Sequence, residues 1–215
     1  MKTESARSSI EIEIRDLAKR YADELKLKMD GRTAEMEADD TSHYLIYQVL
    51  GVSDEEGRLI DIYQNKGRFL YKYAGSFLED AAKLCFLRKY PDASSVRIPN
   101  TIAQRPKTFE IDCLINVKLA IEIKWRDATT DGDHITKEHT RIKVIAAAGY
   151  TPIRVMFYYP NRSQAIRIQQ ALETLYRGVG GQYYFGDSAW EYLRNESGCD
   201  LKEILSCIAI GNWKK

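Results

Sequence analysis

Apolar residues recur at helical spacing in the first third of the chain. A capping box at Ser8-x-x-Glu11 opens a helix whose apolar positions are Ile10, Ile14, Leu17, Tyr21 and Leu25. A second helix is predicted from about Thr33 to Leu50, with Gly51 as its C-terminal glycine. A third, over about 67–90, is apolar on most faces and stops at Pro91, so we expect it to be buried against a sheet.

From Ser94 the apolar period changes to two. We predict helices at about 135–148 and after Pro160-Asn161, and strands at 95–98, 109–115, 119–125 and 153–158. The strands at 109–115 and 119–125 are close enough for an antiparallel hairpin, whereas the last two strands flank a helix and should pair in parallel. The core order α-β-β-β-α-β predicts an α/β fold with a mixed sheet between helices. Ser188-x-x-Glu191 and Asp200-x-x-Glu203 open two short C-terminal helices.

The composition indicates a folded, single-domain protein but does not identify a binding partner. A chain of 215 residues favours a single domain, 1–215, made of an N-terminal helical region (1–66), a core (67–160) and a C-terminal helical extension (161–215). Charged residues make up 29% and hydrophobic residues 44%, which excludes a disordered chain. Because the net charge is only +1, any contact with nucleic acid has to come from a local patch.

Cysteine, histidine and hydropathy patterns exclude several other classes. Cys85, Cys113, Cys199 and Cys207 form no C-x-x-C pair and lie in apolar runs, which favours buried, reduced thiols. The three histidines lack the spacing that puts two imidazoles on one helix face, which argues against a zinc hydrolase. The chain has no apolar run near 18 residues and no secretory h-region, so we expect a cytoplasmic protein without a membrane partner.

Charged side chains on two neighbouring strands are the candidate chemistry. In 109–115 the odd positions are apolar, so Glu110 and Asp112 share the other face; in 119–125 the same alternation puts Glu122 and Lys124 together. In an antiparallel hairpin the numbers of paired residues have a constant sum, and Asp112 stands opposite Glu122 only if that sum is 234. An even sum centres the turn on a single residue, so we predict a turn of odd length or a bulge. Two opposed carboxylates can share one divalent cation, and Mg²⁺ is the expected ion.

A purely structural explanation of these charges is mutual ion pairing. Acid-x-Lys triplets also occur at Glu24-x-Lys26 and Asp200-x-Lys202, but both of those lie in predicted helices. Glu122-x-Lys124 lies instead in an apolar strand beside a strand that carries an acid, where unpaired burial costs several kcal/mol per charge. This context favours a functional site over ion pairing alone.

The chain resembles the PD-(D/E)XK nuclease superfamily over about residues 69–158. The resemblance rests on Asp112, followed after nine intervening residues by Glu122-x-Lys124, inside an α-β-β-β-α-β core. The chain differs in having Ile111 where the motif has proline. The resemblance implies that Asp112 and Glu122 bind the metal, with the Ile123 carbonyl as a possible third ligand. It implies that Lys124 orients or activates the attacking water. A further acid on the first core helix is expected at Glu79, in Gly75-x-x-x-Glu79, with Asp80 as the competing candidate.

Within the superfamily the chain most resembles a type II restriction endonuclease, because helical regions extend the core at both ends. That resemblance implies sequence-specific cleavage of double-stranded DNA by a homodimer with two active sites. The alternatives are a structure-specific or repair nuclease, such as a Holliday-junction resolvase, and a catalytically idle DNA-binding subunit.

Polar residues flanking the catalytic strands are the expected DNA contacts. Arg105 and Lys107 precede the first of these strands and could contact phosphate. The loop after the second strand, and the helix that follows it, carry side chains that can meet base edges. They are Arg126, Asp127, Thr129, Thr130, Asp133, His134, Lys137, His139 and Arg141. The alternative for each of them is a solvated loop or helix face.

Overall fold

The computed structural model describes residues 2–126 and 132–213. The chain divides into two compact units, one formed by residues 15–77 and the other by residues 1–14 and 78–215. The expectation of a single domain, with regions bounded at 66 and 160, stays a prediction. No helix in the described part of the chain is long and apolar enough to cross a membrane.

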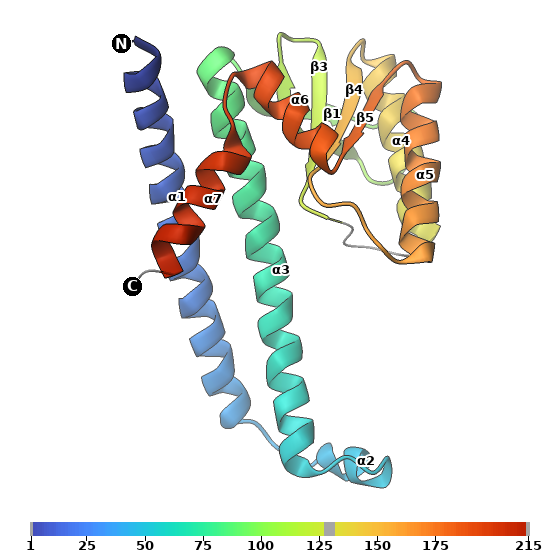
Figure 1. Ribbon diagram of the computed structural model, residues 1–215. Helices are drawn as coiled ribbons and strands as arrows, with labels where there is room; N and C mark the ends of the chain where they lie inside the picture. Colours follow the sequence, from blue (N-terminus) through green and yellow to red (C-terminus); the bar gives the residue numbers. More distant parts are fainter. Residues whose placement is uncertain (1, 127–131, 214–215) are drawn as a thin grey trace. The chain divides into compact units, whose positions relative to one another are not determined.

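The unit 15–77 is helical (Figure 1). It contains most of α1 (Lys2–Glu37), all of α2 (Tyr44–Val49) and the first two-thirds of α3 (Asp54–Lys89). Within it Tyr21 of α1 meets Tyr73 and Phe77 of α3 edge-to-face, with ring centroids 6.1 and 5.8 Å apart. The Tyr47 hydroxyl of α2 donates to Asp61 of α3 at 3.1 Å.

The helix bounds predicted in this region are wrong in three places. The first helix begins before the supposed capping box at Ser8 and runs on through Thr33, because ion pairs at i,i+4 such as Lys19–Asp23 (2.7 Å) support its polar middle. The second helix is reduced to six residues, although Gly51 does follow it with a positive φ of 83°. The third begins at Asp54, where Ser53 Oγ accepts a hydrogen bond from the Glu56 amide.

The second unit is built on a five-stranded mixed sheet in the order β1-β2-β3-β4-β5. β1, β2 and β3 are antiparallel neighbours, and β3, β4 and β5 are parallel neighbours. The predicted α-β-β-β-α-β order is confirmed, while β5 was not predicted. The strands are β1 (Ser94–Pro99), β2 (Thr108–Ile115), β3 (Leu119–Lys124), β4 (Thr151–Met156) and β5 (Gln182–Phe185).

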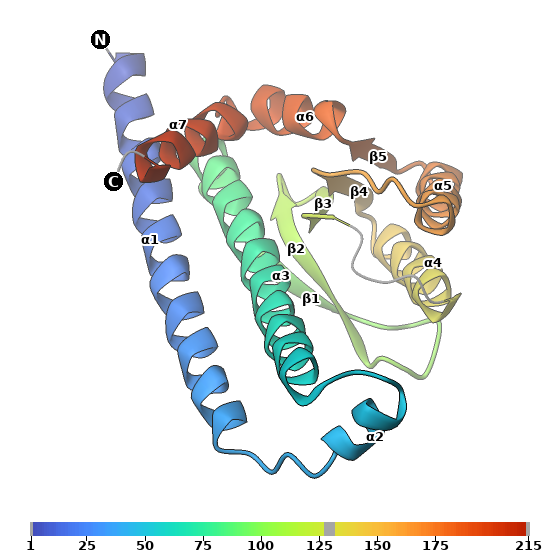
Figure 2. The ribbon, with the colours of Figure 1, turned by 60° about the horizontal axis from the view of Figure 1, so that its bottom comes forward.

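Helices cover both faces of this sheet (Figure 2). On one face α4 (Gly132–Ala147) and α5 (Ser163–Gly178) pack side by side, with Val144 and Ile145 against Ile111 and Ala120. On the other face α6 (Asp187–Ser197) places Trp190 on Phe157, with ring centroids 4.3 Å apart. The sheet is therefore shielded from water on both sides, which is the setting in which a charged strand residue needs a partner.

The C-terminal helix and the cysteines agree largely with expectation. The Glu203 amide donates to Asp200 Oδ1 at 3.0 Å at the start of α7 (Leu201–Trp213), as the capping box predicts. Ser188 does not cap α6, because that helix already includes Asp187. All four cysteines are free, and Cys207 alone among them is exposed.

Candidate active site

The β2–β3 hairpin has the register that the charged residues require. Its pairs include Cys113 with Ile121 and Leu114 with Ala120, so paired numbers sum to 234 as predicted. The connecting loop, residues 116–118, has an odd length and places Asn116 and Val117 at φ values of 53° and 50°. This turn keeps Asp112 and Glu122 on neighbouring strands at the same level.

An irregularity in β2 sets the direction of Asp112. The register with β1 shifts between the pairs Ser94–Leu114 and Val96–Ile111, which marks a bulge around Asp112. The Asp112 carboxylate reaches across to β3 and accepts a hydrogen bond from the Ile123 amide at 2.8 Å. Glu110, predicted to share its face, instead lies half-exposed and pairs with Arg97 of β1 at 3.1 Å. The bulge thus separates the two acids of this strand.

Asp112, Glu122 and Lys124 form one cluster. The Lys124 ammonium lies 2.5 Å from Glu122 Oε1 and 3.8 Å from Asp112 Oδ2. Burial, followed by the neighbouring Glu122 charge, raises the pKa of Asp112 to about 7. Burial alone would lower the pKa of Lys124, but the two carboxylates raise it above its usual value, so the amine stays protonated. The cluster joins two acids to one permanent cation.

A buried ionic network continues from this cluster into α4, β4 and α5. The Arg141 guanidinium contacts Glu122 Oε2, and it also donates to the Glu110 carbonyl at 2.8 Å. Glu138, one turn earlier in α4, accepts from Arg154 of β4 at 3.0 Å. Burial opposes the charge of Glu122, but Arg141, Lys124 and Arg154 together lower its pKa. Sequence analysis missed Glu138 and Arg154, although an arginine inside the apolar strand 153–158 was a visible signal.

The acids of α3 lie near the cluster. Glu79 pairs with Lys83 one turn later, at 2.6 Å. Glu79 is also among the charges that raise the pKa of Asp112, whereas Asp80 acts on Lys83. This arrangement favours Glu79 over Asp80 as the additional acid of the site.

The donor atoms of the cluster fit a magnesium ion. In the described ranges, 2–126 and 132–213, no three His, Cys, Asp or Glu side chains form a group that could hold a metal. The carboxylates of Asp112 and Glu122 nevertheless offer oxygen ligands, and Mg²⁺ is commonly held by one or two carboxylates while it keeps several waters. Burial and the neighbouring Glu122 charge disfavour the ionised form of Asp112, and a divalent cation bound beside it would offset both effects.

The expected DNA contacts fall into three groups. Arg105, Lys107 and Lys137 are exposed, and His139 and Arg126 are half-buried. Asp127, Thr129 and Thr130 lie outside the described residues, as do the side chains of Asp133 and His134. The assignment of Arg141 is wrong: its side chain is only 7% exposed and is held by Glu122 and Glu138 in the interior, so it is not available to DNA.

A pocket of about 460 Å³ lies at the carboxyl ends of β3 and β4, and its lining begins at the residue after Lys124. Its walls include Trp125, Arg126 and Tyr158, and the Arg126 guanidinium lies 5.7 Å from the centroid of the Trp125 ring. None of the described residues that line this pocket is acidic, so this lining can accept part of a polyanion.

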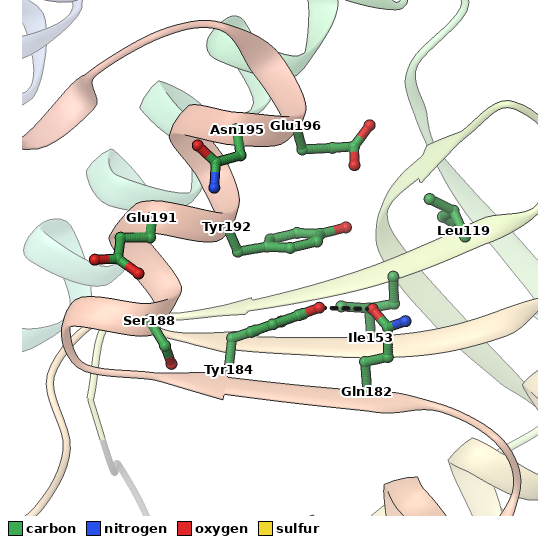
Figure 3. A pocket seen from close by; sticks show the side chains of 9 residues that line it. All are labelled: Leu119, Ile153, Gln182, Tyr184, Ser188, Glu191, Tyr192, Asn195 and Glu196. Carbon is green, nitrogen blue, oxygen red and sulfur yellow. Dashed lines mark hydrogen bonds between the residues drawn. The ribbon is translucent and has the colours of Figure 1, made fainter.

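A second pocket, of about 500 Å³, lies at the opposite ends of β3, β4 and β5, beneath α6 (Figure 3). Tyr184 and Tyr192 stack beside it with ring centroids 4.4 Å apart. Because Glu191 and Glu196 also line it, this pocket is unsuited to a phosphate backbone. Of the two pockets, the one next to Lys124 is therefore the better suited to a polyanion.

Comparison with known protein families shows a match over nearly the whole chain. A family model described as ApaLI-like restriction endonuclease matches residues 1–210. No curated protein and no solved structure shows a significant match to the chain.

Proposed function

We propose, since the chain belongs to the ApaLI-like restriction endonuclease family, that it is a Mg²⁺-dependent, sequence-specific endonuclease that cuts both strands of duplex DNA. Family membership makes the chain a DNA-binding nuclease of restriction-modification systems. The observation that carries the finer proposal is the cluster of Asp112, Glu122 and Lys124 on two strands of a sheet covered on both faces.

In this proposal the oxygen atoms of Asp112, Glu122 and the Ile123 carbonyl hold the metal. Bound Mg²⁺ supplies positive charge for the developing phosphate oxygens and lowers the pKa of a coordinated water. Glu122 Oε2 stays with Arg141, so Oε1 is the oxygen of this residue that is offered to the cation. Glu79 supports the site from α3, next to Lys83.

Lys124 acts as a positioning donor. Its raised pKa keeps three N–H donors on the amine at neutral pH, which suits it to orient a water or a phosphate oxygen rather than to remove a proton. The protonated amine next to both carboxylates also offsets the repulsion between them. Loss of this group should therefore affect the rate more than the fold.

The proposed DNA interface surrounds the carboxyl end of β3. Three side chains would approach the DNA strand near the cleaved bond: Arg126 beside the Trp125 pocket, and Lys137 and His139 on α4. Arg105 and Lys107 would contact DNA phosphates farther from that bond. Asp127, Thr129, Thr130, Asp133 and His134 stay part of this proposal from sequence alone. A two-fold symmetric homodimer would present two such sites to the two strands of a palindrome.

The test is incubation of the purified chain with a long mapped duplex in Mg²⁺ or in EDTA, followed by gel electrophoresis. Discrete fragments that appear only with Mg²⁺ support the proposal. Cleavage restricted to branched DNA would favour a resolvase, and absence of any cleavage would favour an idle binding subunit. Asp112→Asn should remove the activity, whereas Glu110→Gln, a change on the same strand outside the cluster, should retain it.

A further inference from the structure

The helical unit 15–77 exposes most of the large apolar side chains found at the surface of the described residues. Nine of the seventeen exposed ones lie between residues 45 and 71. Four belong to α2 and the residue after it, and α2 itself contains no buried residue. The other five are on α3: Leu59, Ile60, Tyr63, Leu70 and Tyr71. This concentration marks an interaction surface rather than scattered exposure.

The five apolar residues of α3 lie on one face of that helix. At 100° per residue their positions span about 120°, and the most exposed of them, Tyr63 (66%), lies within this span. Gly67 falls on the same face, and a Cβ atom there would meet nothing within 4 Å. Asn65 and Tyr73, which meet α1, lie outside this span, and Phe77, which also meets α1, lies at its edge. The apolar face is therefore without a cover in its own unit.

Charge is segregated along this part of α3. Residues 54–61 contain four acids and one arginine, which gives a net charge of −3. Residues 64–77 contain Lys66, Arg68 and Lys72 and no acid, which gives +3. The acidic half is unsuited to DNA, but a second copy running antiparallel would set each acidic half against a basic half.

We propose that this face of α3, together with α2, is the surface through which two copies of the chain form a homodimer. The two α3 helices run antiparallel about a two-fold axis that passes through the apolar face at the level of residue 65, which sets Tyr63 opposite the open position of Gly67 and Ile60 opposite Leu70. This inference rests on the homodimer in the proposed function and assigns its interface to the helical unit.

The size of the surface agrees with a stable dimer. At about 200 Å² for a fully exposed large apolar residue, the nine exposed fractions amount to roughly 1,000 Å². The largest apolar patch on a monomeric protein is about 300–600 Å², and a standard interface takes about 800 Å² from each partner. A patch of this extent is expected to be covered in solution.

The first test measures molar mass by light scattering or sedimentation, without DNA, over a concentration series. We expect the full chain to have twice its 24.7 kDa mass and Tyr63→Glu to have the single mass, with the dissociation constant raised about tenfold or more. Leu27→Glu, a matched change at an exposed position of α1, should leave the dimer intact. A monomeric unsubstituted chain, or a Tyr63→Glu chain that stays dimeric, would overturn the proposal.

Charge reversal gives a test that misfolding cannot imitate. A chain with Glu55→Lys and Glu56→Lys and a chain with Lys72→Glu should each dimerise more weakly, because in this register Lys72 of one copy lies within about one turn of Glu55 and Glu56 of the other and like charges then meet. An equimolar mixture should form a heterodimer, because opposite charges again meet at these positions. If the mixture dimerises no more strongly than either chain alone while circular dichroism shows both chains folded, the antiparallel interface is refuted. Since no DNA is present, the result is separate from whether the chain cleaves DNA.

Discussion

The guanidinium of Arg141 in α4 contacts the carboxylate of Glu122 in β3, and each of the two side chains is only 7% exposed. The same guanidinium donates to the carbonyl of Glu110 in β2. One residue of α4 therefore ties together the two strands that carry the acids of the candidate site. Arg141 is a positioning residue in this arrangement, because it holds from the interior the carboxylate that we propose as a metal ligand.

Removal of Arg141 should damage both stability and activity. Arg141→Met removes the cation that contacts Glu122 Oε2, and breaking a buried ion pair typically costs about 3–5 kcal/mol, whereas Arg141→Lys keeps part of the pair. Urea unfolding measures the loss. Arg97→Met removes a pair whose side chains are 74% and 49% exposed, and should cost less than about 1 kcal/mol. Equal losses for Arg141→Met and Arg97→Met would contradict the role of Arg141.

Asp112→Asn and Lys124→Met should each abolish Mg²⁺-dependent cleavage while the chain stays folded. Asp112→Asn removes one of the two anionic ligands, and Lys124→Met removes the donor that lies 2.5 Å from Glu122. Gel shift should still detect DNA binding by both variants, because neither change removes an exposed basic residue. A variant with full cleavage would show that the site has been assigned to the wrong residues.

Glu79 and Asp80 can be separated by paired substitutions. We expect Glu79→Gln to lower the cleavage rate about tenfold, equivalent to about 1.4 kcal/mol, because Glu79 acts electrostatically on Asp112. Asp80→Asn is the matched neighbour and should change the rate much less. Single-turnover kinetics at saturating Mg²⁺ measure both. If Asp80→Asn lowered the rate more than Glu79→Gln, Asp80 would be the additional acid of the site.

Lys137 on α4 should contribute to DNA affinity through a phosphate contact. Lys137→Ala is expected to weaken binding uniformly across sequences and to reduce the slope of log affinity against log salt by about 0.9. Lys118→Ala removes an exposed lysine from the β2–β3 turn, near the amino end of β3 and away from Lys124, and should leave the slope unchanged. Fluorescence anisotropy over a salt series distinguishes the two variants.

The local pattern of the sequence was sufficient for the sheet that carries the site. Alternation fixes which residues of a strand share a face, so the Glu122 and Lys124 pair followed from parity. The register sum of 234 followed from the further requirement that Asp112 stand opposite Glu122. The β-α-β connection likewise predicted the parallel pair of β3 and β4. The helix that ends before Pro91 was also predicted correctly at that end, since proline disfavours a helical residue before it.

Tertiary structure decided the rest, because it depends on contacts between residues far apart in the chain. Helix starts at Lys2 and Asp54 differ from those predicted, since i,i+4 ion pairs and packing sustain turns that periodicity leaves polar. The four-residue strand β5 forms because β4 offers it a parallel edge. Whether a charge such as Arg141 faces DNA or a buried carboxylate depends on which element packs over it. The sequence by itself therefore determined the strands and the chemistry they bear, and only the packing of α4 on the sheet decided which charges surround it.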